Sequence, residues 1–269
     1  MSNCNGDCSA FKQDCKDRDL TLKPNEFSRI GKIYAVVSGK GGVGKSSVTC
    51  MLASAMQQRG KQTAVLDADV TGPSVPKMFG LHTRAEADAA GLIPAETSTG
   101  IRVMSINLLL EEEDAPVVWR GPVISGAIQQ FFTEVAWGDV DYMFVDMPPG
   151  TGDVPLTVFQ SLKVDGVIVV TTPQELVSLI VKKAVNMDNL MHVPVVGIIE
   201  NMLVFTCPDC GKQHHIFGKS TAKKAADALG VEVLASLPID PRTPALADKG
   251  AIELADTDAL QPVIERLLG

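Results

Sequence analysis

The sequence has no excess of positive charge. Its 269 residues include 24 lysines and arginines against 32 aspartates and glutamates, which gives a formal net charge of −8. Proteins that bind nucleic acids through electrostatic attraction need clustered basic residues to contact phosphates. The acidic balance therefore excludes that class of protein, and we expect no nucleic-acid partner.

Long hydrophobic runs are also missing. A membrane-spanning helix needs about 18 or more consecutive apolar residues. The richest stretch, residues 193–205, is interrupted by Pro194, Glu200 and Asn201. The opening residues, MSNCNGDCSAFKQDCKDRD, are polar and lack the apolar segment of a secretory signal. These absences predict a cytoplasmic protein without a membrane partner.

The hydrophobic content, 45% of the residues, is sufficient for one large core. Residues 1–28 contain three cysteines and many charges, and we predict a flexible extension there. From Ile33 onward, short β-branched runs alternate with helical patterns. We therefore predict one domain over residues 29–269.

The alternation predicts an α/β fold with a doubly wound, mainly parallel sheet of about seven strands. Most of the expected strands are almost continuously apolar, as strands covered on both faces are. The expected strands are 33–37, 63–67, 101–106, 142–146, 166–171, 195–200 and 231–236. The expected helices fall near 45–58, 122–136, 174–189, 219–229 and 258–268. The expected loops are 83–100 and 111–116, with an irregular excursion over 201–218.

Residues 39–46, GKGGVGKS, match the pattern Gly-x-x-x-x-Gly-Lys-Ser/Thr between an expected strand and an expected helix. Glycines let successive backbone N–H groups curl around an anion, and the helix N-terminus adds its dipole. Lys45 would reach the β- and γ-phosphates of ATP, and Ser46 would ligate Mg²⁺. The residues of this loop expected to bind the nucleotide are Gly39, Lys40, Gly41, Gly42, Val43, Gly44, Lys45, Ser46 and Ser47.

Aspartates follow two of the expected strands, at the edge where ligands bind in open α/β sheets. Asp146 ends the strand YMFVD, where a carboxylate usually holds the water shell of Mg²⁺. Gly150, after a Pro-Pro pair, could offer its N–H to the γ-phosphate. Asp67 and Asp69 lie in LDADVTGPS. Each of these aspartates could instead be a turn or helix-cap residue.

The loop GKGGVGKSS resembles the deviant Walker A ATPases, a class that includes MinD, ParA and the nitrogenase iron protein. More narrowly, DADVTGPSVP, the block 119–153, IENM and CPDC together resemble the Mrp family of iron–sulfur carrier ATPases over residues 28–269. The resemblance implies that Lys40 reaches across a dimer to the partner's nucleotide. It also implies that Asp69 orients the attacking water and that Asn201 reads adenine, although Asn201 could be a plain turn residue.

Cys207 and Cys210 are spaced as C-x-x-C. In a reducing compartment such cysteines are more often metal ligands, redox groups or core residues than disulfides. Thiolates favour zinc and iron–sulfur clusters, and two thiolates fill half of a four-ligand site. We favour a [4Fe-4S] cluster bridging two protomers. The alternatives are zinc completed by His214 or His215, a redox pair and an incidental pair.

The N-terminal cysteines, Cys4, Cys8 and Cys15, are one ligand short of a four-thiolate set. They are candidate ligands of a second cluster or part of a solvent-exposed tail. Cys50, on the helix expected after the phosphate loop, is predicted to be a small core residue.

The resemblance implies an ATP-hydrolysing carrier that binds a [4Fe-4S] cluster at a dimer interface and transfers it to apo-proteins. The dimer would be a homodimer or a heterodimer with a related ATPase. The alternatives are a positioning ATPase like MinD or ParA, a zinc-binding P-loop ATPase and a reductase like the nitrogenase iron protein. The final residues, 258–269, lack the basic face of a membrane-binding helix.

Overall fold

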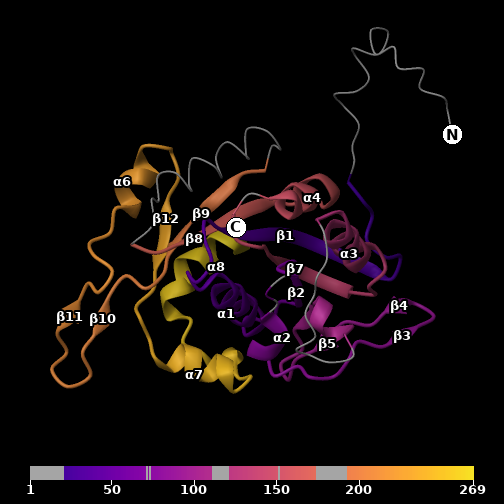
Figure 1. Ribbon diagram of the computed structural model, residues 1–269, viewed down its shortest axis with the longest axis horizontal. Coiled ribbons are helices and arrows are strands. Elements are labelled where there is room, and N and C mark those ends of the chain that lie inside the picture. The colour runs from indigo at the N-terminus through magenta and orange to yellow at the C-terminus, as the bar shows by residue number, and fades with distance from the viewer. Residues whose placement is uncertain (1–20, 71, 73, 111–120, 151, 174–192) are drawn as a thin grey trace, which may run out of the picture.

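Eight strands form the main sheet of the computed structural model, which describes residues 21–70, 72, 74–110, 121–150, 152–173 and 193–269 (Figure 1). All neighbouring strands pair in parallel except β5 and β6. In spatial order they are β12 (Val233–Ser236), β9 (Val195–Glu200), β8 (Gly166–Thr171), β1 (Ser28–Ser38), β7 (Gly138–Asp146), β2 (Thr63–Asp67), β6 (Arg102–Met104) and β5 (Ala95–Glu96).

The predicted doubly wound, mainly parallel sheet is therefore confirmed. All seven predicted strands are present, and β5 is an eighth, antiparallel edge strand within the predicted loop 83–100. The same stretch also contains a hairpin of β3 (Ala87–Asp88) and β4 (Gly91–Leu92). Prediction missed these strands because each is only two residues long and depends on its partner.

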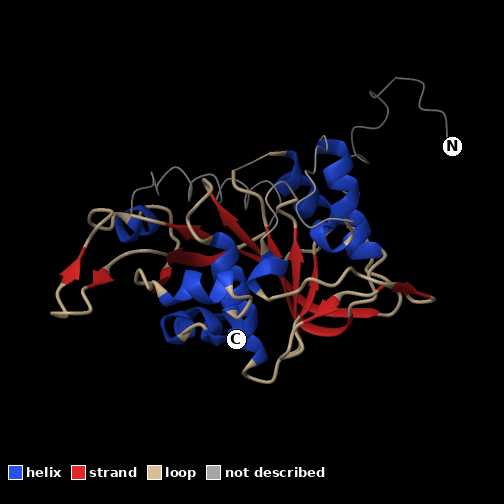
Figure 2. Ribbon diagram, turned by 60° about the horizontal axis from the view of Figure 1, so that its bottom comes forward, coloured by secondary structure: helices blue, strands red, loops and turns tan. Residues whose placement is uncertain are grey.

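Helices cover both faces of the sheet (Figure 2). The predicted helices near 45–58, 122–136, 219–229 and 258–268 are present with different ends, whereas the predicted helix 174–189 and loop 111–116 lie outside the described residues. The α-helices are α1 (Lys45–Gln57), α2 (Val75–Met78), α3 (Gly121–Thr133), α4 (Asp153–Ser161), α6 (Ala222–Asp227), α7 (Arg242–Asp248) and α8 (Gln261–Leu268). The 3-10 helices are η2 (Ile106–Leu108), η3 (Ile252–Leu254) and η4 (Asp258–Leu260).

The strands alternate between two apolar cores, because successive side chains of a strand point to opposite faces. In β9, Ile198 packs in the core that includes α3, α4 and α6, and Ile199 packs in the core that includes α1 and α8. Trp137 is fully buried in the first core, where its indole N–H donates to the Phe131 carbonyl at 3.0 Å. The sheet is thus covered on both sides, as its apolar strands predicted.

The predicted irregular excursion over 201–218 contains a hairpin of β10 (Phe205–Thr206) and β11 (Gln213–His214). In Figure 1 this hairpin extends away from the main sheet, at the end where β9 and β12 lie. The excursion therefore holds regular structure at its tip.

Residues just before β1 contact the body of the domain. The Leu22 N–H donates to the Ser161 carbonyl at 2.7 Å, and the Asn25 amide donates to the Ala90 carbonyl at 2.8 Å. The division of the chain at residues 28 and 29 stays a prediction. Within the described part of the chain, no helix has the length and apolar character needed to cross a membrane.

Candidate functional site

The phosphate loop lies between β1 and α1, at the carboxyl edge of the sheet. Gly42 and Gly44 both have φ near +82°, a conformation that favours glycine. A Cβ atom placed on Gly42 would meet nothing within 4 Å, so this part of the loop borders open space. Helix α1 then begins at Lys45. This curled loop at a helix N-terminus is the geometry of an anion-binding site.

Lys45 is held among acidic side chains beneath the loop. Its side chain is only 6% exposed, and its Nζ lies 2.8 Å from Asp146 Oδ1 and 3.7 Å from Asp69 Oδ2. The structure thus brings together three residues that the sequence separates by up to 101 positions (146 − 45). These three are among the four predicted catalytic residues.

Asp146 is fully buried at the end of β7 and accepts hydrogen bonds from two hydroxyls as well as the Lys45 ammonium. Ser46 Oγ donates to Oδ2 at 2.6 Å, and Thr49 Oγ1 donates to Oδ1 at 2.9 Å. Sequence reasoning missed Thr49. Its signal is the spacing of four residues from Lys45, which places both on one face of α1.

Asp67 is the register partner of Asp146 on β2 and is also fully buried. Burial, followed by the charge of Asp146, raises the pKa of Asp67 to about 8. Ser105 Oγ donates to Asp67 Oδ2 at 3.1 Å, and the Asp69 N–H donates to Oδ1 at 3.1 Å. The carboxyl group of Asp67 therefore holds the chain that carries Asp69.

This raised pKa predicts a pH-dependent stability. Above about pH 4 the unfolded chain loses the Asp67 proton that the folded chain keeps up to about pH 8, so the free energy of unfolding falls as pH rises. The loss amounts to at most about 1.4 kcal/mol per pH unit. In urea unfolding between about pH 5 and pH 7, Asp67→Asn should remove this contribution, and Asp139→Asn, an exposed control, should keep it. Equal pH slopes for Asp67→Asn and wild type would contradict the assignment.

The backbone N–H of Gly150 is bonded to β1. Its φ is +89°, and its N–H donates to the Ser38 carbonyl at 3.0 Å. The N–H that was expected to reach a γ-phosphate is thus bonded within the protein, because the chain turns back along β1 after Asp146. A contact between Gly150 and a phosphate requires this bond to open.

Asn201 packs directly against the phosphate loop. Its Nδ2 donates to the Val43 carbonyl at 2.9 Å, and its Oδ1 accepts the Met202 N–H at 2.9 Å. A Cβ atom on Gly44 would lie 2.3 Å from Asn201 Nδ2, so only glycine allows this approach. The loop and Asn201 are therefore in close contact. The adenine-reading role of Asn201 stays a prediction.

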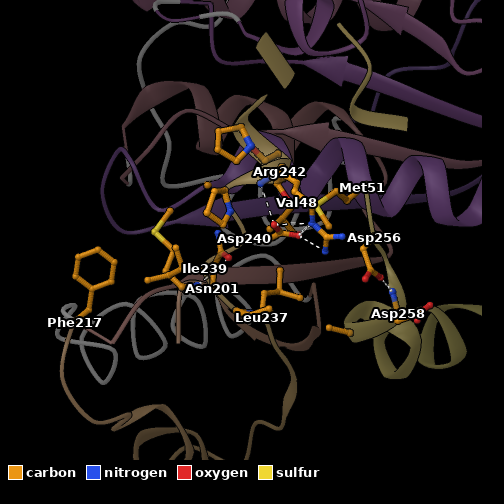
Figure 3. A pocket seen from close by; sticks show the side chains of 18 of the residues that line it. Val48, Met51, Asn201, Phe217, Leu237, Ile239, Asp240, Arg242, Asp256 and Asp258 are labelled. Carbon is orange, nitrogen blue, oxygen red and sulfur yellow. Dashed lines mark hydrogen bonds and ion pairs between the residues drawn. The ribbon is translucent and has the colours of Figure 1, made fainter. Parts of the chain in front are cut away.

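A pocket of about 560 Å³ opens beside the phosphate loop (Figure 3). Its walls are mostly apolar, and Asn201 and Ser47 contribute polar groups to its lining. At its side, Arg242 Nη2 lies 2.7 Å from Asp240 Oδ2, and hydrogen bonds from Arg242 lower the pKa of Asp240. The further lining residues include Gly44, Val48, Met51, Met202, Ile216, Phe217, Leu237 and Ile239. A ligand with phosphates in the loop would place its remaining part here.

Lys40 is an exposed residue near the start of the phosphate loop. Its carbonyl accepts the Ser38 hydroxyl at 3.0 Å, which fixes the start of the loop. Lys45 is buried against Asp146, whereas Lys40 is exposed. The two lysines therefore face different surroundings.

Cys207 and Cys210 lie in the turn between β10 and β11. The Cys207 N–H donates to the Lys212 carbonyl at 2.9 Å, and the Gly211 N–H donates to the Cys207 carbonyl at 2.9 Å. Hydrogen bonds from the Cys210 and Asp209 N–H groups, followed by the Cys210 side chain, lower the pKa of Cys207. Cys207 is half-buried and Cys210 is exposed. The turn therefore presents both sulfurs on one hairpin.

The zinc alternative requires His214 or His215 as a ligand beside the two cysteines. His214 pairs with Phe205 in the hairpin, and His215 Nδ1 lies 3.3 Å from the Leu203 carbonyl. Among the residues that the structure describes, no three Cys, His, Asp or Glu side chains are grouped to hold a metal ion. The hairpin itself supplies two thiolates.

Of the four remaining cysteines, Cys50 lies within the described residues. Cys50 is fully buried on α1, which confirms its predicted place in the core, and burial raises the pKa of its thiol. Cys4, Cys8 and Cys15 lie outside the described residues.

Comparisons with known proteins agree with this geometry. A family model described as NUBPL iron-transfer P-loop NTPase, within ParA, matches residues 29–267. An iron-sulfur cluster carrier protein of Methanocaldococcus jannaschii is 43% identical over 283 residues, covering 100% of this chain and 97% of that protein. An iron-sulfur cluster carrier protein of Methanococcus maripaludis is 42% identical and covers 91% of this chain and 85% of that protein.

Solved structures share the fold of this chain. A nucleotide-binding protein of Archaeoglobus fulgidus in complex with ADP is 43% identical, with a TM-score of 0.78 over 86% of this chain and 91% of that chain. MinD of Pyrococcus horikoshii with Mg-ADP is 19% identical, with a TM-score of 0.60 over 88% of this chain and 94% of that chain, and supports the fold alone. The chain belongs to the NUBPL iron-transfer P-loop NTPase family.

Proposed function

We propose that this protein is a cytoplasmic ATPase that carries a [4Fe-4S] cluster between two protomers and transfers it to apo-proteins. The observation that carries the proposal is the cysteine hairpin, which places the free cysteines Cys207 and Cys210 on one turn in a chain with a complete phosphate loop. The carrier names of its relatives support the cargo. Two thiolates per chain and four per cluster favour a symmetric dimer, because such a dimer places the same patch opposite itself.

The residues around the phosphate loop fit a magnesium–nucleotide complex. Ser46 Oγ lies 2.6 Å from Asp146, so Ser46 would ligate Mg²⁺ and Asp146 would hold its water shell. The bound ion supplies positive charge to the phosphate oxygens. Lys45 is already held at this point by Asp146 and would turn its ammonium to the β- and γ-phosphates. The backbone N–H groups of the loop complete the anion site.

Hydrolysis requires an activated water, and Asp69 is the carboxylate we assign to it. Its side chain is 15% exposed and 3.7 Å from Lys45, so it lies beside the proposed phosphate site and remains open to water. Its place is fixed from behind by the bond between its N–H and Asp67. Asp69 would orient the water and accept its proton.

Asp69→Asn should therefore retain ATP binding and lose turnover by about 100-fold or more, because an amide cannot accept the proton. Phosphate release and equilibrium ATP binding measure the two effects separately. Asp227→Asn, at an exposed aspartate of α6, is the matched control and should behave as wild type. Turnover by Asp69→Asn at the wild-type rate would remove Asp69 from this role.

Lys40 is the residue that would make ATP hydrolysis depend on the dimer. Because Lys40 is exposed whereas Lys45 is buried against Asp146, we assign Lys40 to the nucleotide of a facing protomer. That protomer is a second copy of this chain or a related ATPase. A cation supplied in this way stabilises the charge that develops on the transferred phosphoryl group.

A further inference from the structure

The segment carrying both cysteines leaves the sheet after β9 and is tied together at its base. We call residues 201–219 the cysteine excursion. Glu200, the last residue of β9, accepts a hydrogen bond from Ser220 Oγ at 2.7 Å. Ser220 Oγ also accepts the Ala222 N–H at 3.2 Å, at the start of α6. The Glu200–Ser220 bond therefore joins the two residues that flank the excursion.

Glu200 is an unusual residue for the end of a buried strand. It is 2% exposed and lies in register with Thr171 of β8 and Ser236 of β12. Its Oε2 accepts the Ser220 hydroxyl, but its buried Oε1 has no hydrogen-bond partner among the described residues. A buried carboxylate oxygen without a donor costs free energy and calls for an explanation beyond packing.

The excursion also touches the nucleotide pocket at both of its ends. Asn201 bonds the phosphate loop at Val43, and Met202 next to it has φ of +58°, a conformation that is strained for a residue other than glycine. At the other end, Ile216 and Phe217 line the same pocket, where Figure 3 shows Phe217 and Asn201. A nucleoside in the pocket would therefore meet the excursion on both sides of the cysteines.

We propose that Glu200 and Ser220 are positioning residues that couple occupancy of the nucleotide pocket to the cysteine pair. Their bond holds the base of the excursion closed, and binding of a nucleoside triphosphate against Asn201 and Phe217 loosens it. Because the Glu200–Ser220 bond is a single hydrogen bond and Met202 nearby is strained, a small movement of the excursion can break this bond. The consequence for cluster release rests on the proposed function, whereas the movement itself does not.

Amide hydrogen exchange on the full-length, cluster-free protein tests the movement, because local opening sets the exchange rate. In wild type, Mg-ATP should speed exchange within the excursion. Ser220→Ala removes the hydrogen bonds to Glu200 and Ala222, so it should exchange about tenfold faster or more without ATP, and ATP should add nothing further. Its affinity for ATP should rise by up to about the same factor, because ATP no longer has to loosen the Glu200–Ser220 bond and coupling between two sites is reciprocal.

Two variants separate coupling from simple loss of structure. Ser220→Thr keeps a hydroxyl and should restore the wild-type response to ATP. Ser236→Ala removes an exposed hydroxyl at the same edge of the sheet, next to Glu200, and should respond as wild type. A wild-type response in Ser220→Ala, an equal loss in Ser236→Ala or no response in wild type would overturn the proposal.

The same variants then test the consequence for the cargo. In cluster-loaded protein, ATP should speed cluster release from wild type and Ser220→Thr but leave the release rate of Ser220→Ala unchanged. Failure of wild type to load iron would contradict the proposed function alone, because the exchange experiment needs no cluster. An unchanged ATP effect on release in Ser220→Ala would overturn the coupling.

Discussion

Mixing a Lys40→Ala chain with an Asp69→Asn chain is expected to restore ATP turnover, although each variant alone is nearly inactive. Lys40 is an exposed residue of its phosphate loop, whereas Asp69 lies 3.7 Å from Lys45 within its own site. In the mixed dimer, the site on the Lys40→Ala chain keeps its own Asp69 and receives Lys40 from the partner. Lys40→Ala alone should lose about 10³-fold in turnover, the lower end of the effect of a cation supplied across an interface.

Turnover measured against mixing ratio tests this prediction. Random pairing at equal amounts makes about half of the dimers mixed, each with one working site, so turnover should reach about a quarter of wild type. The matched control mixes Lys45→Ala with Asp69→Asn. Lys45 serves its own chain, so neither site of that mixed dimer is complete and turnover should not recover. Absence of recovery in the Lys40 mixture as well would place Lys40 in its own site or in a structural role.

Replacing Cys207 or Cys210 by alanine should remove the iron–sulfur cluster entirely. A four-iron cluster held only by protein needs four thiolates, and in a symmetric dimer each substitution removes two of them. ATP binding should persist, because neither cysteine lines the nucleotide pocket. Cys50→Ala is the control, since Cys50 is buried on α1 and its loss should leave the cluster unchanged.

Cluster content is measured by iron, sulfide and visible absorption after anaerobic reconstitution. Full iron content in Cys207→Ala or Cys210→Ala would contradict the assignment of the hairpin as the cluster site. Loss of iron in Cys50→Ala would show instead that loading depends on core stability.

The parts of the fold that could be predicted are those with a local signal. The buried strands are almost continuous apolar runs, and the phosphate loop has fixed spacing, so β1, α1 and their order follow from the sequence. Asp146 could be placed because it ends an apolar strand. Thr49 also has a local signal, its spacing of four residues from Lys45 on α1.

The parts that could not be predicted depend on which distant segments meet. The nucleotide pocket combines α1 with residues 237–244, which carry no recognisable motif. The engaged N–H of Gly150 follows from the path of the chain beside β1. Likewise, the bond between Glu200 and Ser220 spans 20 positions and appears only when the excursion folds back.

In the proposed dimer, two protomers share one cluster through their cysteine hairpins. Native mass spectrometry on the reconstituted full-length chain, with Cys4, Cys8 and Cys15 changed to serine, tests it most directly. The expected result is a dimer that carries about four irons and four sulfides, and that loses them when Cys207 is changed to alanine. A monomer carrying one zinc would contradict the claim.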